Sequence, residues 1–177
     1  RTLLFAVGRH VPYKGMEYLV RASKLLDERF LVRIAGSGPL TEELRALAAD
    51  DAKVGFLGRI SDVELKAYLL ACDVFCFPSV TKNEAFGIAL AEAMSFAKPA
   101  VTFTIPGSGV NYVCLNHETG IECPNGDVKA YAHAINTLEE DKELASRYGK
   151  AARERFEALF TQEKFSQNVK RLIAELS

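Results

Sequence analysis

The chain has 177 residues, of which 49% are hydrophobic and 25% charged, and its formal net charge at pH 7 is −1. This length suits one domain with a substantial core, and the composition excludes disordered and membrane-spanning classes. A net charge near zero gives no general field for nucleic acid or an anionic membrane surface. We therefore expect one globular domain over 1–177, in which any anionic ligand is held by local groups.

Short apolar runs alternate with stretches of helical spacing along the chain. Runs rich in β-branched and aromatic residues predict strands at 3–7, 30–35, 54–57, 74–77 and 100–103, with a shorter one at 120–123. Helical spacing fills the intervals, and the last part of the chain is expected to form helices at 128–139, 142–158 and 161–175. This alternation predicts an α/β fold, a doubly wound, Rossmann-like parallel sheet covered on both faces.

The loops that follow the strands are the candidate sites, because ligands of such sheets bind outside the carboxyl ends of the strands. The first loop, VGRHVPYKG, places Arg9 and Lys14 beside the expected start of a helix. Two cations at a helix N-terminus can hold a pyrophosphate, and solvated surface cations are the equal alternative. The second loop, IAGSGPL, has Thr41 where a dinucleotide fingerprint needs its third glycine. We interpret it as a tight turn with Pro39 in the first turn of a helix, and close approach of a ligand is the alternative.

Three further loop features are less specific. Gly58, Arg59 and Ile60 follow the third strand, where backbone groups can meet a planar base, and Ser61 or Asp62 can cap the next helix. Lys82 is either a phosphate contact or a loop cation. The turn TIPGSG, residues 104–109, either shapes a pocket or is only a loop.

Two carboxylates, Glu84 and Glu92, stand eight residues apart in the otherwise mostly apolar and small run TKNEAFGIALAEAM. A helix that begins near residues 85–86 would leave Glu84 in the preceding loop and place Glu92 two turns along, about 12 Å away. That is too far for one acid/base pair, but it suits an elongated ligand such as a sugar nucleotide. The alternatives are a helix-dipole partner for Glu84 and an exposed helix residue for Glu92, although small apolar neighbours predict a narrow exposed face there.

The cysteines and histidines show no metal-binding or catalytic pattern. The four cysteines form no CxxC pair or zinc-ligand cluster with histidine, so we expect reduced, buried thiols in a cytosolic protein. No DxD sequence stands at a strand end, and a metal-bridged diphosphate is therefore not indicated. The three histidines are scattered and stand in no triad-like order, so we assign them no role.

Taken together, VGRHVPYKG, IAGSGPL, VGFLGRIS and TKNEAFGIALAEAM resemble, over nearly the whole chain, the carboxyl-terminal half of retaining glycosyltransferases of family four, which have the GT-B fold. The resemblance implies a hexosyltransferase that uses a nucleoside-diphosphate sugar. Arg9 and Lys14 would bind the donor diphosphate and stabilise its departure, and Glu84 would contact donor-sugar hydroxyls. The implied donor-binding residues are Gly8, Gly58, Arg59, Ile60, Lys82, Phe86, Gly87, Ile88 and Glu92.

Within that implied set, the amides of residues 86–88 would meet sugar and phosphate, Glu92 would hold the ribose hydroxyls, and Ile60 would meet the base. The segment PGSGVNYV departs from the commoner family pattern, so the resemblance gives residues 104–109 no role. His10 also stands where an apolar residue is more usual.

In this family the active site lies between two Rossmann-like domains, and the amino-terminal one contributes acceptor contacts and part of the catalytic apparatus. The chain begins inside an expected strand, so we expect a donor-binding domain whose partner domain is absent and which transfers little or no sugar alone. We therefore expect no cofactor or metal, no nucleic acid, a cytoplasmic location, and peripheral membrane association only through the absent domain. The resemblance points to a mannosyltransferase in surface-polysaccharide or glycoconjugate synthesis, with a glycan or a lipid-linked acceptor. The residues themselves do not identify the base or the sugar of the donor, the acceptor, or the oligomeric state.

Other functions on the same scaffold are alternatives. A sugar-nucleotide epimerase would differ in the product formed by the full-length enzyme, and a glycosyl phosphorylase would need a much longer chain. A stand-alone nucleotide-binding module is the non-enzyme alternative. A phosphoacceptor signalling domain would need acidic residues after the first and third strands, where this chain has Gly8-Arg9 and Gly58-Arg59.

Overall fold

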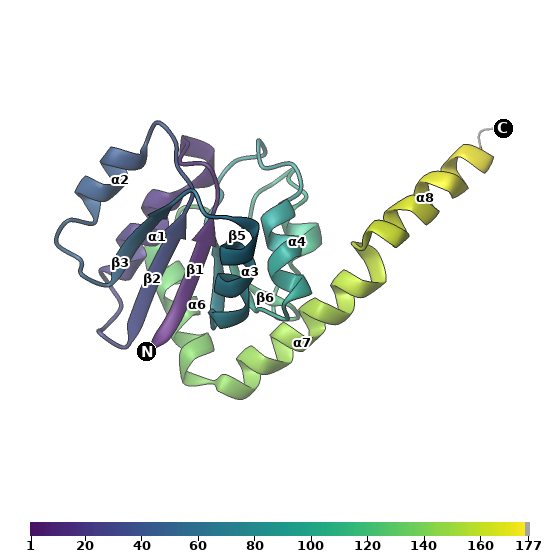
Figure 1. Ribbon diagram of the computed structural model, residues 1–177. Helices are drawn as coiled ribbons and strands as arrows, with labels where there is room; N and C mark the ends of the chain where they lie inside the picture. The colour runs from purple at the N-terminus through teal and green to yellow at the C-terminus, as the bar shows by residue number, and fades with distance from the viewer. Residues whose placement is uncertain (176–177) are drawn as a thin grey trace.

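The computed structural model describes residues 1–175 and contains one six-stranded parallel sheet with the strand order β3-β2-β1-β4-β5-β6 (Figure 1). Its strands are β1 (Thr2–Val7), β2 (Phe30–Ala35), β3 (Val54–Gly58), β4 (Val74–Phe77), β5 (Ala100–Phe103) and β6 (Gly120–Cys123). The predicted strands are confirmed, four of them with the predicted bounds. The last two residues of the expected domain, 176 and 177, lie outside the described part.

Helices cover both faces of this sheet, as predicted for a doubly wound fold. They are α1 (Met16–Ser23), α2 (Thr41–Leu47), α3 (Asp62–Ala71), α4 (Ile88–Ser95), α5 (Val110–Val113), α6 (Val128–Glu140), α7 (Lys142–Leu159) and α8 (Gln162–Glu175), with a one-turn 3-10 helix at Pro12–Lys14. Helices α1, α2 and α6 lie on one face of the sheet, and α3 and α4 lie on the other (Figure 1). The reversal of strand order between β1 and β4 follows from this two-sided winding.

The core consists of strand side chains packed between these two helical layers. Its largest fully buried members include Phe5, Phe30, Phe75, Phe103 and Tyr131. The phenolic group of Tyr131 donates a hydrogen bond to the carbonyl of Val101 at 2.8 Å, so the ring is buried without an unpaired hydroxyl. This core fixes the strand ends from which the candidate site loops start.

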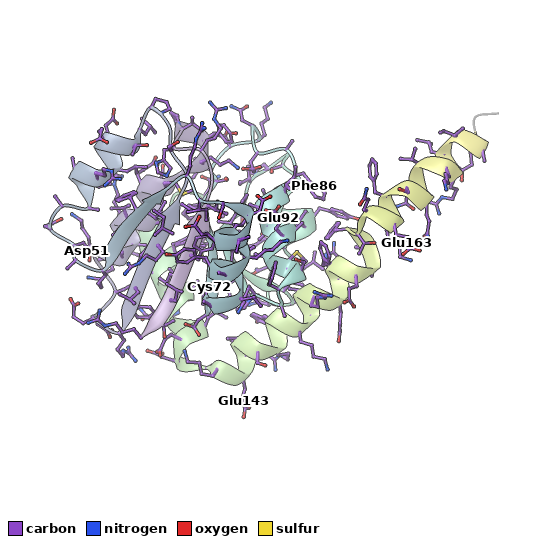
Figure 2. All side chains as sticks on the ribbon, viewed as in Figure 1. Asp51, Cys72, Phe86, Glu92, Glu143 and Glu163 are labelled. Carbon is purple, nitrogen blue, oxygen red and sulfur yellow. The ribbon has the colours of Figure 1, made fainter. Side chains whose placement is uncertain are left out.

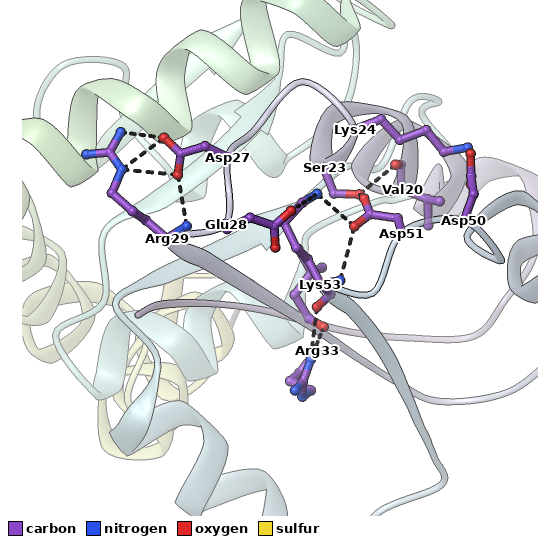
Figure 3. Close-up of polar contacts among 11 residues, drawn as sticks. Val20, Ser23, Lys24, Asp27, Glu28, Arg29, Arg33, Asp50, Asp51 and Lys53 are labelled. Atoms are coloured by element: carbon purple, nitrogen blue, oxygen red, sulfur yellow. Dashed lines mark hydrogen bonds and ion pairs between the residues drawn. The ribbon is translucent and has the colours of Figure 1, made fainter.

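A buried carboxylate ties the end of α1 to the start of β3, away from the carboxyl edge of the sheet (Figure 3). Asp51 lies 2.8 Å from the Lys53 ammonium and 2.7 Å from the Ser23 hydroxyl. Burial raises the pKa of Asp51, but the hydrogen bonds from Lys53 and Ser23 outweigh it and leave the pKa below its ordinary value. The contact is therefore structural and stabilises the α1–β3 corner.

The last two helices differ in how they contact the rest of the domain. Helix α7 packs on α4 and α6, and a Cβ at Gly149 would lie 2.2 Å from the carbonyl oxygen of Ala97, so this approach requires glycine. Helix α8 projects beyond the domain body (Figure 1), has no buried residue, and exposes Phe165, Leu172 and Ile173. None of the helices within residues 1–175 is both long and apolar enough to cross a membrane.

Candidate functional site

The loops after β1 and β4 meet where the strand order reverses. These two strands are neighbours in the sheet, paired through Leu4 with Val74 and Phe5 with Phe75, while their crossovers run to opposite faces. Such a switch point leaves a crevice outside the carboxyl ends of the strands. The sequence predicted site residues in both loops, and the structure brings them together here.

Lys14 and Glu84 form an ion pair across this switch point. Their side chains are only 15% and 10% exposed, and the Ser79 hydroxyl donates a second hydrogen bond to the same Glu84 carboxylate oxygen at 3.0 Å. The Lys14 ammonium also lies 5.4 Å from the centre of the Phe77 ring. The sequence placed both residues near a ligand but did not predict that they bind each other.

Close backbone contacts hold the two loops in place. The N–H of Val80 donates to the carbonyl of Tyr13 at 3.0 Å, which bridges the loops directly. Gly15 has φ +61°, and a Cβ there would lie 2.1 Å from the carbonyl oxygen of Pro78. Glycine at this position therefore lets the first loop approach the second closely enough for Lys14 to reach Glu84.

The glycines of the loops after β1, β2 and β3 pack on one another. A Cβ at Gly36 would lie 1.9 Å from the carbonyl oxygen of Gly8, and the Gly36 N–H donates to the carbonyl of Gly58 at 2.7 Å. The IAGSGPL segment thus serves close backbone packing, in line with its interpretation as a tight turn. The placement of Pro39 was wrong: it lies in the turn before α2, because the Thr41 N–H bonds to the Gly38 carbonyl and the helix begins only at Thr41.

His10 was assigned no role from the sequence, and the structure buries it completely. Its Nδ1 lies 2.9 Å from the Thr41 hydroxyl oxygen, and its Nε2 is buried without a partner among the described residues. Its backbone N–H bonds to the Ser37 carbonyl, and its carbonyl accepts from the Leu40 N–H. Burial, and then the positive charge of Arg45, lower the pKa of His10. A neutral His10 therefore joins the first and second loops.

Helix α4 begins later than predicted. Its first residue is Ile88 and its N-cap is Gly87 with φ +90°, so residues 85–86 belong to the loop. Glu92 consequently stands about one turn into the helix instead of two, and the 12 Å estimate, which assumed helix from Glu84 onward, does not apply. The delay arises because the Gly87 conformation interrupts the helical path.

Glu92 is exposed, and the exposed face of α4 is narrow, as predicted, because Leu90, Ala91, Ala93 and Met94 fill the buried side of the helix. Figure 2 labels Glu92 at α4. Partial desolvation, and then the negative charge of Asp62 at the start of α3, raise the pKa of Glu92. The carboxylate has no cationic partner within residues 1–175 and can accept hydrogen bonds from a ligand.

The remaining predicted residues lie around this edge without forming one cluster. Arg9, Arg59 and Lys82 are exposed, and the Arg9 side chain makes no polar contact within residues 1–175. Ile60 is half-buried against the core, and Gly58 has φ +68°. The backbone N–H groups of the 86–88 segment, at the start of α4, are hydrogen-bond donors without a partner inside the helix.

An apolar groove of about 470 Å³ adjoins the glutamate-bearing helix. Its lining comes from α4 and the loop before it, from α5, and from α7, α8 and the turn between them. It includes Phe86, Ile88, Tyr112, Phe160 and Phe165. Phe86 and Glu92 both contribute to it and lie at α4 in Figure 2. The groove could not be predicted from the sequence, because its lining comes from segments far apart in the chain.

No group of three or more His, Cys, Asp or Glu side chains within residues 1–175 is arranged to hold a metal ion. All four cysteines are free and buried, as predicted. Burial raises the pKa of the Cys72 thiol to about 12, so it is unreactive at neutral pH. The polar chemistry of this edge rests on Lys14, Arg9 and the two glutamates.

Comparison with known proteins agrees with this fold. The family described as "Glycosyl transferases group 1" matches residues 1–155. The chain is 35% identical over 157 residues to O-antigen chain mannosyltransferase C of Escherichia coli, covering 88% of this chain and 42% of that protein. It is 37% identical over 163 residues to D-rhamnosyltransferase WbpZ of Pseudomonas aeruginosa, covering 91% and 42%.

Among solved structures, sucrose-phosphate synthase from Thermosynechococcus elongatus superposes with a TM-score of 0.87 and 29% identity, covering 99% of this chain and 45% of that one. The chain thus spans less than half the length of each of these three relatives. With the match over residues 1–155 and the switch-point geometry, this chain belongs to the group 1 glycosyl transferase family and has the Rossmann-like architecture of GT-B glycosyltransferases.

Proposed function

We propose that the chain is the donor-binding domain of a retaining glycosyltransferase, which transfers a hexose from a nucleoside-diphosphate sugar to a glycan or lipid-linked acceptor. The observation that carries this proposal is the Lys14–Glu84 pair at the switch point of the sheet. It joins a cation suited to phosphate and a carboxylate suited to sugar hydroxyls. The mannosyl- and rhamnosyltransferase relatives support mannose or a related sugar, used in surface-polysaccharide or glycoconjugate synthesis.

In this proposal the diphosphate lies over the start of α4, between Arg9 and Lys14. The Arg9 side chain is exposed and has no polar partner within residues 1–175, so its guanidinium is available to bind a phosphate oxygen. Negative charge builds on the departing nucleoside diphosphate as the glycosidic bond breaks, and cations placed there stabilise that charge. Because Arg9, Lys14 and the helix N-terminus supply the positive field, we propose that no metal is needed.

The two glutamates mark the two ends of the donor. Glu84 is buried beside Lys14 and would accept from the sugar hydroxyls, while exposed Glu92 would accept from the ribose hydroxyls. Arg59 and Ile60 would border the base, and Lys82 would add a phosphate contact. The order sugar, diphosphate, ribose then follows the path from the loop into α4.

We further propose that a second, amino-terminal domain completes the active site and contributes any association with a membrane surface. The relatives' greater length and the apolar groove of about 470 Å³ support this. The four free thiols suit a reducing, cytoplasmic setting.

Calorimetric titration with guanosine and uridine diphosphates, with and without a chelator, tests the donor-site proposal. Binding should be unchanged by the chelator. Arg9→Ala should weaken it about tenfold or more, since one charge-assisted phosphate contact is lost. Arg21→Ala, which removes an exposed arginine from α1, is the matched control and should bind normally. Binding abolished by the chelator, or equally weakened by both substitutions, would refute the assignment.

A further inference from the structure

We propose that Ser108 is a positioning residue which, with the Gly109 amide, sets the place of Glu84 for sugar transfer; this rests on the proposed function of Glu84. Residues 104–109, called here the clamp loop, connect β5 to α5. The sequence and the family pattern gave this loop no role. Its contacts in the structure reach the backbone of the loop that carries Glu84.

The clamp loop holds two successive carbonyls of the glutamate loop (residues 78–87). The Ser108 hydroxyl donates to the carbonyl of Glu84 itself, and the Gly109 N–H donates to the carbonyl of Ala85 at 2.9 Å. Two adjacent carbonyls fixed by one loop define both the position and the direction of the backbone at Glu84. A Cβ at Gly109 would lie 2.5 Å from the Ala85 carbonyl oxygen, so the contact also requires glycine.

The clamp loop is itself anchored and can therefore act as a rigid support. The Asn111 side chain accepts from the Ile105 N–H at 2.7 Å and donates to the Phe103 carbonyl at 3.1 Å, which fixes the loop to the end of β5. The Asn125 amide donates to the carbonyls of Thr104 and Val80, at 3.1 and 2.9 Å, and so joins the starts of both loops. Ser108 also accepts from the Val110 N–H at 3.2 Å, which links it to α5.

The glutamate loop depends on such support because neither a strand nor a helix sets its conformation between β4 and α4. The Glu84 carboxylate is also held by Lys14 and Ser79. A donor diphosphate that takes up Lys14 would remove one of these side-chain contacts. The backbone clamp would then determine where the carboxylate meets the sugar, so its loss should appear in transfer more than in nucleotide binding.

Ser108→Ala in the full-length protein tests this, with GDP-mannose as the donor probe and GDP release as the readout. We expect kcat to fall about tenfold or more while KM for the donor and affinity for GDP change less than about twofold, since misplacement by a fraction of an ångström affects the reacting geometry. Ser108→Thr keeps the hydroxyl and should restore kcat. Ser95→Ala is the matched control: it also removes a serine hydroxyl bonded to a glutamate carbonyl, that of Glu92 at 2.6 Å, but inside helix α4.

A double-mutant cycle separates positioning from a general structural role. If Ser108 acts through Glu84, Ser108→Ala should change kcat by less than about twofold in a Glu84→Ala background. An undiminished loss there, or a parallel fall in GDP affinity, would overturn the proposal.

Hydrogen exchange gives a readout that does not depend on the donor. Ser108→Ala should speed amide exchange across residues 81–87, and Ser108→Thr should not. If wild-type protein fails to bind GDP or GDP-mannose, the proposed function is in error, and the exchange result still decides whether the clamp exists. If Ser108→Ala leaves amide exchange across residues 81–87 unchanged, the proposal that the clamp loop holds the glutamate loop is wrong, even if the enzyme is active.

Discussion

Replacing Glu84 with glutamine should destabilise the domain without impairing nucleotide binding. The carboxylate accepts hydrogen bonds from the Lys14 ammonium and, at 3.0 Å, from the Ser79 hydroxyl, and hydrogen bonds to a charged group each contribute about 1.5–3 kcal/mol. Glutamine keeps one acceptor oxygen but leaves the ammonium, only 15% exposed, without a counter-charge. We therefore expect the free energy of unfolding to fall by about 2–4 kcal/mol.

Urea unfolding followed by circular dichroism measures this loss, and Glu42→Gln is the matched control. Glu42 is 90% exposed and lies 3.8 Å from Arg45, so its loss should cost less than about 0.5 kcal/mol. Affinity for a nucleoside diphosphate should hold or rise in Glu84→Gln, because Lys14 is no longer neutralised. Transfer by the full-length protein should fall by about 100-fold, the loss expected for one positioned transition-state contact. Full stability with abolished nucleotide binding would refute the reasoning.

Two further predictions concern Glu92 and His10. Glu92→Gln should weaken binding of a ribonucleoside diphosphate by about 1.5–3 kcal/mol and spare its 2′,3′-dideoxy analogue, as calorimetry would show. Because the pKa of Glu92 is raised, ribonucleotide affinity should also fall as the pH drops and the carboxylate is protonated; equal pH profiles for both ligands would contradict this. The lowered pKa of His10 means that the unfolded chain gains a proton first, so the free energy of unfolding should decrease below about pH 6.5. In His10→Phe, the free energy of unfolding measured with urea should no longer decrease in this way as the pH falls. An unchanged pH profile would mean that another group causes the decrease.

The strand bounds were predictable because short apolar runs bounded by glycine, proline or polar residues carry their own signal. Strand β2 at Phe30–Ala35 and strand β5 at Ala100–Phe103 match the predicted ranges residue for residue. The start of α4 was not predictable in the same way. The helical spacing continues back through Phe86, and the left-handed conformation of Gly87, with φ +90°, is what separates the loop from the helix.

Pairwise contacts between distant loops were also beyond the sequence. Lys14 and Glu84 are 70 positions apart, and each alone suits either a ligand or solvent. Their pairing depends on β1 and β4 being neighbours in the sheet, on Gly15 fitting under the Pro78 carbonyl, and on the bond from Val80 to Tyr13. The exposure of Glu92 likewise depends on tertiary packing, because it is set by which side of α4 faces the core.

The centre of the proposed site is electrically self-neutralised. Lys14 and Glu84 satisfy each other, whereas exposed Arg9 has no polar partner within residues 1–175 and Glu92 faces only the like charge of Asp62. A ligand with an anionic centre and hydroxyls on both sides would replace the Lys14–Glu84 contact by two contacts of the same kind, cation to phosphate and carboxylate to hydroxyl. Such an exchange conserves the hydrogen bonds that burial makes costly to lose, which is why a sugar nucleotide suits this edge better than a ligand charged at its ends.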